Sequence, residues 1–422
     1  MLAVMVGAFL AGFGSAQALD TFDLFPNWQL PLPTPSPTPT RTLPAEPTST
    51  PTPITPPTPT NEDEEAFALF WEAWGLIQDH YYGDLPTAEK LTHAAIRGML
   101  ESLDDRFVAF VEPDVAAMQA EDESGEFQGI GAWIDMDPET GELIIIDTFE
   151  GSPAEVAGLE AEDRVLAVDG VSIIDRSIYE AIQLIRGPEG STVTLLVERE
   201  GVDEPFEIEI TRARVEIPLT EAEVRDDGVA YVRLYDFQAT VTSDRLRQAL
   251  ETALAEDPEG LVFDLRGNGG GRLDEAIDVA DLFLADGLIL IERWGDGREN
   301  TYDAQPGELA EEIEMVVLVD RASASASEIV AGALQDHGRA VLVGETTFGK
   351  GAVQLVFNLS DGSELWVPAA RWFTPNDRMI QGTGLTPDIE IPYPEDGTDQ
   401  ASEGEALDPQ LERAVDYLLE SE

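Results

Sequence analysis

The sequence predicts a multidomain protein of α/β and α+β class, with N-terminal helices, a β-rich domain that includes helices, and a mixed α/β core. Three observations lead to this prediction. Apolar residues before about residue 104 recur at helical spacing, short strand-like runs occupy about 126–211, and β-branched runs alternate with helical stretches from about residue 228. Such alternation is typical of α/β domains.

The N-terminus has the composition of an export signal followed by a stalk. Residues 2–19 are apolar and uncharged and end in Ala-Gln-Ala, a small-x-small cleavage pattern, so 1–19 is predicted as a signal peptide or signal anchor. Residues 20–62 are predicted as a disordered stalk, because the run 31–60 is almost all Pro, Thr and Ser. We therefore expect an extracytoplasmic protein, anchored in a membrane or secreted, in the periplasm or on the cell surface.

The region 63–116 is predicted to be helical. One helix carries an apolar stripe at i, i+3, i+4 and i+7 spacing, formed by Phe67, Phe70, Trp71, Trp74 and Ile77. A second helix is predicted at about 87–103. We interpret the stripe as core packing; a homodimer contact through these helices is the alternative.

The remaining elements follow from the period of the apolar residues. The β-rich part has strand-like runs at 126–135, 142–149, 191–200 and 206–213 and a helix near 176–185. The core has strand-like runs at 229–237, 261–267, 288–294, 315–320 and 340–346, with helices at 243–256, 273–284 and 325–335. An acidic linker and a short helix close the chain.

Charge and composition exclude several kinds of site. The chain has 84 acidic against 24 basic residues, a net charge of −60, which repels nucleic acid and anionic lipid. It has no Cys, which excludes a thiol nucleophile and thiolate metal sites. Its three histidines, His80, His93 and His337, show no HExxH spacing. We expect no nucleic-acid partner, no metal and no cofactor.

Three loops that follow predicted strands could carry chemistry, namely 266–271, 323–328 and 344–351. The third matches a phosphate-binding loop in part, but Gly351 stands where Ser or Thr is required, and a strand-like run follows where a helix should begin. Nucleotide binding is therefore disfavoured. The serine loop has a structural interpretation too, because Ser325 and Glu328 fit a helix capping box.

Lysine is nearly absent from this chain: only Lys90 and Lys350 occur among the basic residues. Arginine stays protonated, whereas a buried lysine can lose its proton and act as a base. Lys350 with Ser325 would form a Ser–Lys hydrolase, although a solvated surface lysine is the alternative. His337 lies twelve residues after Ser325, about 15 Å or more along the same predicted helix, which disfavours a histidine triad.

The residues of these three loops are similar to those of a known family. Over about 63–422 it resembles the C-terminal processing peptidases, or tail-specific proteases, which are serine endopeptidases with a Ser–Lys pair and an embedded PDZ domain. The residues that match the family's catalytic stretch read SASASEIVAGALQDHGRAVLVGETTFGKGAVQ. The family's serine precedes its lysine by 25 residues, which implies Ser325 rather than Ser323 or Ser327. Its supporting glutamine, one helical-looking step after the lysine, implies Gln354, and a structural or auxiliary aspartate implies Asp336.

The resemblance also assigns roles to backbone groups. The family's glycine loop reads DLRxNPGG, and this chain has DLRGNGGG, with Gly269 in place of the proline. This implies oxyanion donors at Gly269 or Gly270, together with Ala326. Residues 117–205 resemble the PDZ domain, whose carboxylate-binding loop would be Gly129, Ile130, Gly131 and Ala132; a silent β-rich spacer is the alternative. Arg164 could be a switch residue between PDZ domain and protease, or a solvated arginine.

The resemblance thus implies a peptidase core at 206–395 and an acidic linker with a C-terminal helix at 396–422. We expect an exported serine endopeptidase that cleaves proteins near apolar, unstructured C-termini without metal, ATP or cofactor. Its partners would be protein or peptide substrates with a free C-terminus, and an N-terminal membrane tether is expected if the signal is an anchor. The alternative is a non-catalytic PDZ peptide-binding protein on a peptidase-like scaffold.

Overall fold

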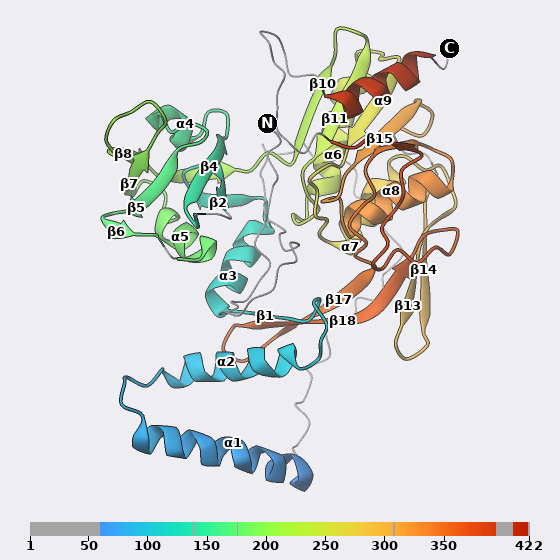
Figure 1. Ribbon diagram of the computed structural model, residues 1–422. Coiled ribbons are helices and arrows are strands. Elements are labelled where there is room, and N and C mark those ends of the chain that lie inside the picture. Colours follow the sequence, from blue (N-terminus) through green and yellow to red (C-terminus); the bar gives the residue numbers. More distant parts are fainter. Residues whose placement is uncertain (1–59, 138–139, 175, 307–308, 394–407, 421–422) are drawn as a thin grey trace. The chain divides into compact units, whose positions relative to one another are not determined.

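The computed structural model describes residues 60–137, 140–174, 176–306, 309–393 and 408–420 (Figure 1). The expected signal at 1–19, nearly all of the expected stalk and the acidic linker lie outside these residues. Within them, no helix is both long and apolar enough to cross a membrane. The described chain forms two units, one of residues 60–104 and one that begins at residue 105.

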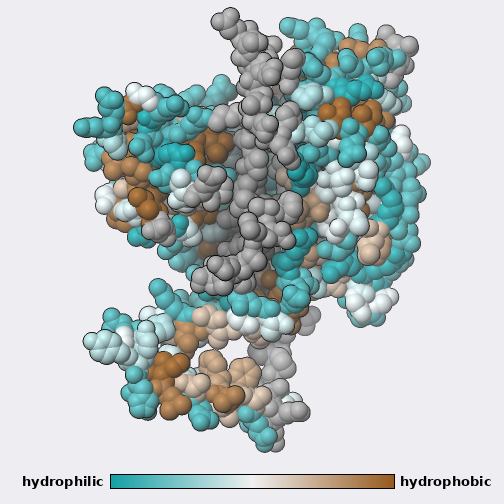
Figure 2. Space-filling model, in the orientation of Figure 1, coloured by the Kyte–Doolittle hydropathy of each residue, from teal (hydrophilic) through white to brown (hydrophobic). Residues whose placement is uncertain are grey.

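The first unit is a pair of helices, α1 (Asn61–His80) and α2 (Ala88–Glu101). Thr87 caps α2 by accepting the Lys90 N–H at 3.2 Å, and Leu100 is buried. The core-packing interpretation of the α1 stripe is wrong for Phe67 and Trp71, which are 57% and 62% exposed. Figure 2 shows hydrophobic side chains gathered over these helices. Helical period identifies an apolar face, but it does not say what covers that face.

The second unit contains a β-rich domain built on one antiparallel sheet of order β3-β4-β5-β7-β8, with β6 paired to β5. Its helices are α4 (Pro153–Ala157) and α5 (Ile178–Ile185), the latter closed by a Ser177–Glu180 capping box. Alternate residues of the strands, such as Val193 and Leu195, are fully buried against α5 and the facing strands. The strands are β3 (Ala132–Met136), β4 (Leu143–Thr148), β5 (Arg164–Val168), β6 (Val171–Ser172), β7 (Thr192–Glu198) and β8 (Phe206–Thr211).

Two short elements flank this domain in sequence. Helix α3 (Pro113–Asp122) precedes it, and β2 (Glu126–Gly129) pairs with β9 (Ala213–Glu216) as a two-stranded ribbon. The ribbon joins the chain entering the domain to the chain leaving it. The domain is thereby held at both ends.

The core is built on a six-stranded sheet of order β10-β11-β12-β15-β16-β19, parallel from β11 onward. Its strands alternate between two faces. In β11, Ala230 and Val232 pack with α6, α7 and α8, whereas Val229 and Tyr231 pack with α9. The strands are β10 (Thr220–Val224), β11 (Val229–Leu234), β12 (Gly260–Asp264), β15 (Met315–Val319), β16 (Val341–Gly344) and β19 (Ile389–Glu390); the helices are α6 (Thr242–Leu254), α7 (Leu273–Asp281), α8 (Ala326–Asp336) and α9 (Pro409–Glu420).

A second, antiparallel sheet has the order β1-β18-β13-β14, with β17 paired to β18. The run at 288–294 is a strand as predicted, but it belongs to this sheet and not to the parallel one. The mixed helix-and-sheet class predicted from the sequence is confirmed. The strands are β1 (Ala109–Val111), β13 (Leu288–Trp294), β14 (Glu299–Asp303), β17 (Ala352–Asn358) and β18 (Glu364–Phe373).

Candidate active site and peptide-binding groove

The three loops singled out in the sequence lie at one edge of the parallel sheet. They follow β12, β15 and β16, which are neighbours, and parallel neighbours end at the same edge. Backbone hydrogen bonds join them: Ala324 N–H donates to Asn268 O and Phe348 N–H donates to Ser323 O, each at 3.0 Å. The glycine, serine and lysine loops therefore form one connected surface.

The three serines of the second loop differ in surroundings. Ser323 and Ser327 are fully buried, and their hydroxyls donate to Leu265 O and Asn268 O, each at 2.8 Å. Ser325 is partly exposed and directly precedes α8. Only Ser325 is thus placed to meet a substrate, while its neighbours fasten the serine loop to the glycine loop.

The backbone at Ser325 is strained, with φ 54° and ψ −112°, a region that residues other than glycine seldom adopt. Such strain typically costs about 1–3 kcal/mol and is concentrated at functional sites. Gly270 (φ 92°) lies against it: a Cβ there would stand 2.8 Å from Ser325 Cβ and 2.7 Å from Ala326 N. The close approach of these two loops therefore requires glycine at position 270.

A buried carboxylate, Glu328, joins the serine and lysine loops. Its Oε2 accepts the N–H groups of Ser325 at 2.8 Å and Lys350 at 2.9 Å. Its Oε1 accepts the Gly349 N–H at 2.7 Å and the Thr347 hydroxyl at 2.6 Å. Burial raises the pKa of Glu328, and these hydrogen bonds oppose the rise. Sequence reasoning identified Glu328 only as a capping residue and missed its contact with Lys350.

Lys350 lies between β16 and β17. Burial lowers the pKa of its ammonium to about 8, although the nearby charge of Glu328 acts in the opposite direction. Its carbonyl accepts the indole N–H of the buried Trp372 at 3.1 Å. The segment after it is strand β17, so the objection to a phosphate-binding loop holds.

Gln354 lies in strand β17, which corrects the expectation of a helical step after the lysine. A bulge between Val353 and Gln354 shifts the pairing with β18. The Gln354 amide donates to Phe107 O at 2.6 Å. Lys350 itself precedes the strand, and the bulge interrupts the alternation of side chains before Gln354, so strand periodicity does not place the two side chains on one face.

Two further residues lie away from this edge. Asp336, at the end of α8, pairs with Arg378 and accepts the Asn376 N–H at 2.8 Å, so it fastens the turn after β18. His337 lies at the C-cap of the same helix, with its Nε2 2.7 Å from Leu288 O. No set of three or more His, Asp or Glu side chains in the described residues could hold a metal ion.

The glycine loop contributes backbone N–H groups. The Gly270 N–H donates to the Asn268 side chain at 2.9 Å, and the Asn268 amide donates in turn to Leu234 O at 2.9 Å. Among the described residues, no such partner is seen for the N–H of Gly269 or of Ala326. Ala326 is buried, whereas Gly269 is partly exposed.

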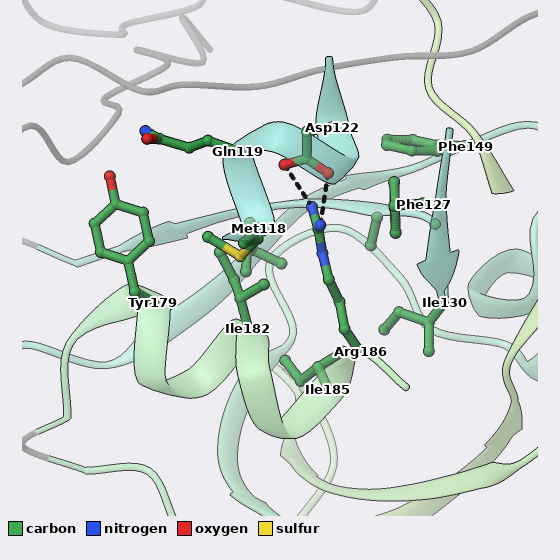
Figure 3. A pocket seen from close by; sticks show the side chains of 13 residues that line it. Met118, Gln119, Asp122, Phe127, Ile130, Phe149, Tyr179, Ile182, Ile185 and Arg186 are labelled. Carbon is green, nitrogen blue, oxygen red and sulfur yellow. Dashed lines mark hydrogen bonds and ion pairs between the residues drawn. The ribbon is translucent and has the colours of Figure 1, made fainter. Parts of the chain in front are cut away.

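The expected PDZ loop, Gly129–Ala132, leads into β3, an edge strand of its sheet. Its carbonyls at Ile130 and Gly131 accept N–H groups from the β4–α4 segment at 2.8 and 3.1 Å. An apolar pocket adjoins the loop (Figure 3), with further walls from α5 and from α3. Its labelled apolar residues are Met118, Phe127, Ile130, Phe149, Ile182 and Ile185.

A buried ion pair crosses one side of this pocket. Arg186 donates to both oxygens of Asp122, at 2.5 and 3.0 Å (Figure 3), and its guanidinium lies 4.4 Å from the centre of the Phe127 ring. Burial raises the pKa of Asp122, and Arg186 opposes that rise. No pattern in the sequence singled out this pair. Arg164, by contrast, pairs with Asp137 and Glu142 in the connection between β3 and β4, at 3.1 and 2.7 Å.

Comparison with known proteins agrees with the resemblance. A model of peptidase family S41 matches residues 228–391, and a PDZ domain model matches residues 150–199. The carboxyl-terminal-processing protease of Synechocystis is 37% identical over 325 residues, covering 76% of either chain. That of Bartonella bacilliformis is 38% identical over 321 residues, 74% of this chain and 72% of the relative.

Among solved structures, the photosystem II D1 C-terminal processing protease matches with a TM-score of 0.50 and 30% identity, covering 79% of this chain and 94% of that one. The family match, the relatives and the solved structure all agree on the family. This chain therefore belongs to peptidase family S41, among the carboxyl-terminal-processing proteases, as a serine-type peptidase with a PDZ domain.

Proposed function

We propose that this peptidase cleaves proteins near apolar, unstructured C-termini, with Ser325 as nucleophile, neutral Lys350 as general base, and no metal or cofactor. The observation that carries the proposal is the buried Glu328 carboxylate, because one of its oxygens accepts the N–H groups of both Ser325 and Lys350. A single group thus fixes the backbone of nucleophile and base together. The pKa of Lys350, lowered from 10.5 to about 8, supports this role because it enlarges the fraction of neutral amine near neutral pH.

The reaction then has two halves. Neutral Lys350 takes the proton of the Ser325 hydroxyl as the oxygen bonds to the scissile carbonyl carbon, and the ammonium returns a proton to the departing amine. A water molecule next loses a proton to Lys350 and attacks the acyl ester, and the Lys350 ammonium gives that proton to the departing Ser325 oxygen, which releases the new carboxyl group and restores the neutral amine. Gln354, four residues after Lys350 along the chain, is proposed to help orient Lys350.

The oxyanion donors are proposed to be the Ala326 N–H at the start of α8 and an N–H of the Gly269–Gly270 pair. Two points support this placement: a helix start presents unpaired N–H groups, and Gly270 touches Ser325 closely. The Gly270 N–H already donates to Asn268, which favours Gly269 as the second donor. Asp336 would act only on the fold.

Substrate selection is proposed to occur on the PDZ domain. An extended C-terminal tail would add to the free edge of β3, and its carboxylate would bind the N–H groups of the Gly129–Ala132 loop. Apolar side chains would enter the pocket beside Ile182 and Ile185. The net charge of −60 supports a preference against acidic tails.

The N-terminal region supports the remaining part of the proposal. The apolar residues 1–19 and the Pro/Thr-rich stalk support an exported enzyme, secreted or tethered to a membrane. The exposed apolar residues of α1, including Phe67 and Trp71, support a homodimer through the N-terminal helices.

The two lysines provide a matched experiment. Lys350→Arg should abolish cleavage of a tailed model protein because arginine keeps its proton, whereas Lys90→Arg, in exposed α2, should cleave like wild type. Ser325→Ala should lose cleavage and still bind the tail. Cleavage by the Lys350→Arg variant at the wild-type rate would refute the mechanism. Tail binding with no cleavage by the wild-type enzyme would instead identify a non-catalytic binding protein.

A further inference from the structure

We propose that the C-terminal helix α9 positions the catalytic glycine loop, through Asp408 and Gln410 acting on Arg266. The inference rests on the proposed function, because it concerns the loop that would stabilise the oxyanion. It assigns a role in the reaction to a helix that lies on the opposite face of the parallel sheet from α8.

Arg266 is the arginine of the DLRGNGGG loop. Two carboxylates bind it, one from Asp264 in the same loop and one from Asp408, which is 142 residues further along the chain. Its Nε donates to Asp264 Oδ1 at 3.0 Å, and its Nη2 donates to Asp264 Oδ2 at 2.6 Å. Its Nη1 donates to Asp408 Oδ2 at 2.7 Å and to Gln410 Oε1 at 3.1 Å. Asp264 is fully buried, and the side chain of Arg266 is only 12% exposed.

Asp408 and Gln410 each make two kinds of contact. Asp408 uses Oδ1 to accept the N–H groups of Gln410 and Leu411, both at 3.0 Å, and thereby caps α9. Its other oxygen is left for Arg266. The fully buried Gln410 accepts from Arg266 and donates its amide to Ile391 O at 2.7 Å, just after β19. The start of α9 thus joins the end of β12 to the far edge of the sheet.

The rest of α9 fixes this start in place. Ala414, Val415 and Leu418 are buried against β11, β12, β15 and β16. Leu418 lies so close to the beginning of β12 that a Cβ at Gly260 would be 3.1 Å from its methyl groups. Because this apolar face is buried in a shared cluster with four strands, the helix cannot shift without displacing several side chains.

A short series of hydrogen bonds connects the glycine loop that follows Arg266 to the loop that contains Ser325. The Gly267 N–H donates to Asp320 at 3.0 Å, and Asn268 O accepts from Ala324 N–H and from the Ser327 hydroxyl. Two residues further along, Gly270 makes the close approach to Ser325. A rotation of the Arg266 side chain would therefore be transmitted to the loop that faces the nucleophile.

Asp264 pairs with Arg266 through Nε and Nη2 but also lies beside the charge of Arg233, so Asp408 supplies a second carboxylate to these two arginines. Burial by itself would raise the pKa of Asp264, but Arg266 and Arg233 hold it below its ordinary value. The Asp408 carboxylate also fixes the orientation of the Arg266 guanidinium, because it binds Nη1, the one guanidinium nitrogen that Asp264 does not bind. Asp408 and Gln410 are therefore positioning residues.

Asp408→Asn is the decisive variant, because asparagine caps helices about as well as aspartate, whereas its amide nitrogen cannot accept the hydrogen bond from Arg266 and the negative charge beside Arg266 is lost. In the full chain we expect kcat for a tailed substrate to fall about tenfold or more, with KM and the tail dissociation constant unchanged. Amide hydrogen exchange at residues 267–271 should accelerate. Asp408→Glu should recover part of kcat, and Leu419→Ala, on the exposed side of α9, should match wild type in every measurement.

An unchanged kcat and unchanged exchange at 267–271 in Asp408→Asn would overturn the inference. Gln410→Met provides a second test if Asp408→Asn does not fold, because it keeps the side-chain volume and removes both hydrogen bonds. A wild-type enzyme without Ser325-dependent cleavage would refute the proposed function alone. The exchange measurement would then still decide whether α9 fixes the glycine loop.

Discussion

The protonation state of Lys350 gives the sharpest quantitative prediction. If the neutral amine is the base, kcat/KM must follow the fraction of enzyme in which Lys350 has lost its proton. Burial places that pKa at about 8, against an ordinary value of 10.5. The pH dependence of cleavage therefore measures how strongly the site depresses this pKa.

The expected size of the effect follows directly. With a pKa of about 8, neutral Lys350 makes up roughly 9% of the enzyme at pH 7 and roughly 91% at pH 9, so kcat/KM should rise about tenfold. A lysine at its ordinary pKa would give a rise of about a hundredfold over the same interval, with no plateau below about pH 10. The two cases differ in both the ratio and the plateau.

The assay is hydrolysis of a tailed substrate without groups that titrate between pH 6 and 10, compared with tail binding by Ser325→Ala at each pH. Binding should stay level while kcat/KM climbs to half its maximum near pH 8. Glu328→Gln should move the midpoint lower, because the charge that raises the pKa of Lys350 is gone. A flat profile, or a midpoint near 10.5, would refute the neutral-lysine base.

Three other substitutions test separate parts of the structure. Gly270→Ala places a Cβ 2.8 Å from Ser325 Cβ and should lower kcat/KM about a hundredfold without weakening tail binding; rates within twofold of wild type would contradict the proposed loop contact. Asp336→Ala should cost about 1–3 kcal/mol in denaturant unfolding with kcat nearly unchanged, and a selective loss of kcat would instead place Asp336 in the reaction. Burial raises the pKa of Asp236 to about 8, so the folded protein binds a proton that the unfolded chain releases. The free energy of unfolding should therefore fall by up to about 1.4 kcal/mol per pH unit as the pH rises from about 5 to 7. Asp236→Asn should remove that slope in unfolding measured at both pH values, and an unaltered slope would show that the carboxyl is already ionised.

The core elements were predictable because the spacing of apolar residues in each segment is that of a helix or of a strand. The helix predicted at 273–284 is α7, and the run at 315–320 contains β15. What the period cannot give is the pairing partner of a strand. The run at 288–294 has the same apolar, β-branched character as β15, yet it pairs with β14 and β18 in the antiparallel sheet. Its neighbours come from segments up to about 80 residues away, which local patterns do not encode.

The active site could be predicted only in part from physical chemistry. Scarcity of lysine and the position of Lys350 after a buried strand indicated a base, and Ser325 was one of three serines in a helix-starting loop. The choice among those serines came from the 25-residue spacing of a resembling family. The structure supplies an independent reason for that choice, since Ser323 and Ser327 have buried, hydrogen-bonded hydroxyls. The burial of these two hydroxyls depends on the glycine loop, which follows another strand, and it cannot be predicted from the sequence of the serine loop alone.

The capping interpretation and the catalytic interpretation of Ser325-x-x-Glu328 were set against each other in the sequence, and the structure shows that they are compatible. Glu328 accepts the Ser325 N–H, as a capping glutamate does. The same oxygen also accepts the Lys350 N–H from a loop 22 residues away. A capping residue on an exposed helix would have water as its other partner. Because Glu328 is buried, its remaining hydrogen bonds must come from protein, and the lysine loop supplies them. Replacing Glu328 should thus separate the two loops as well as uncap the helix.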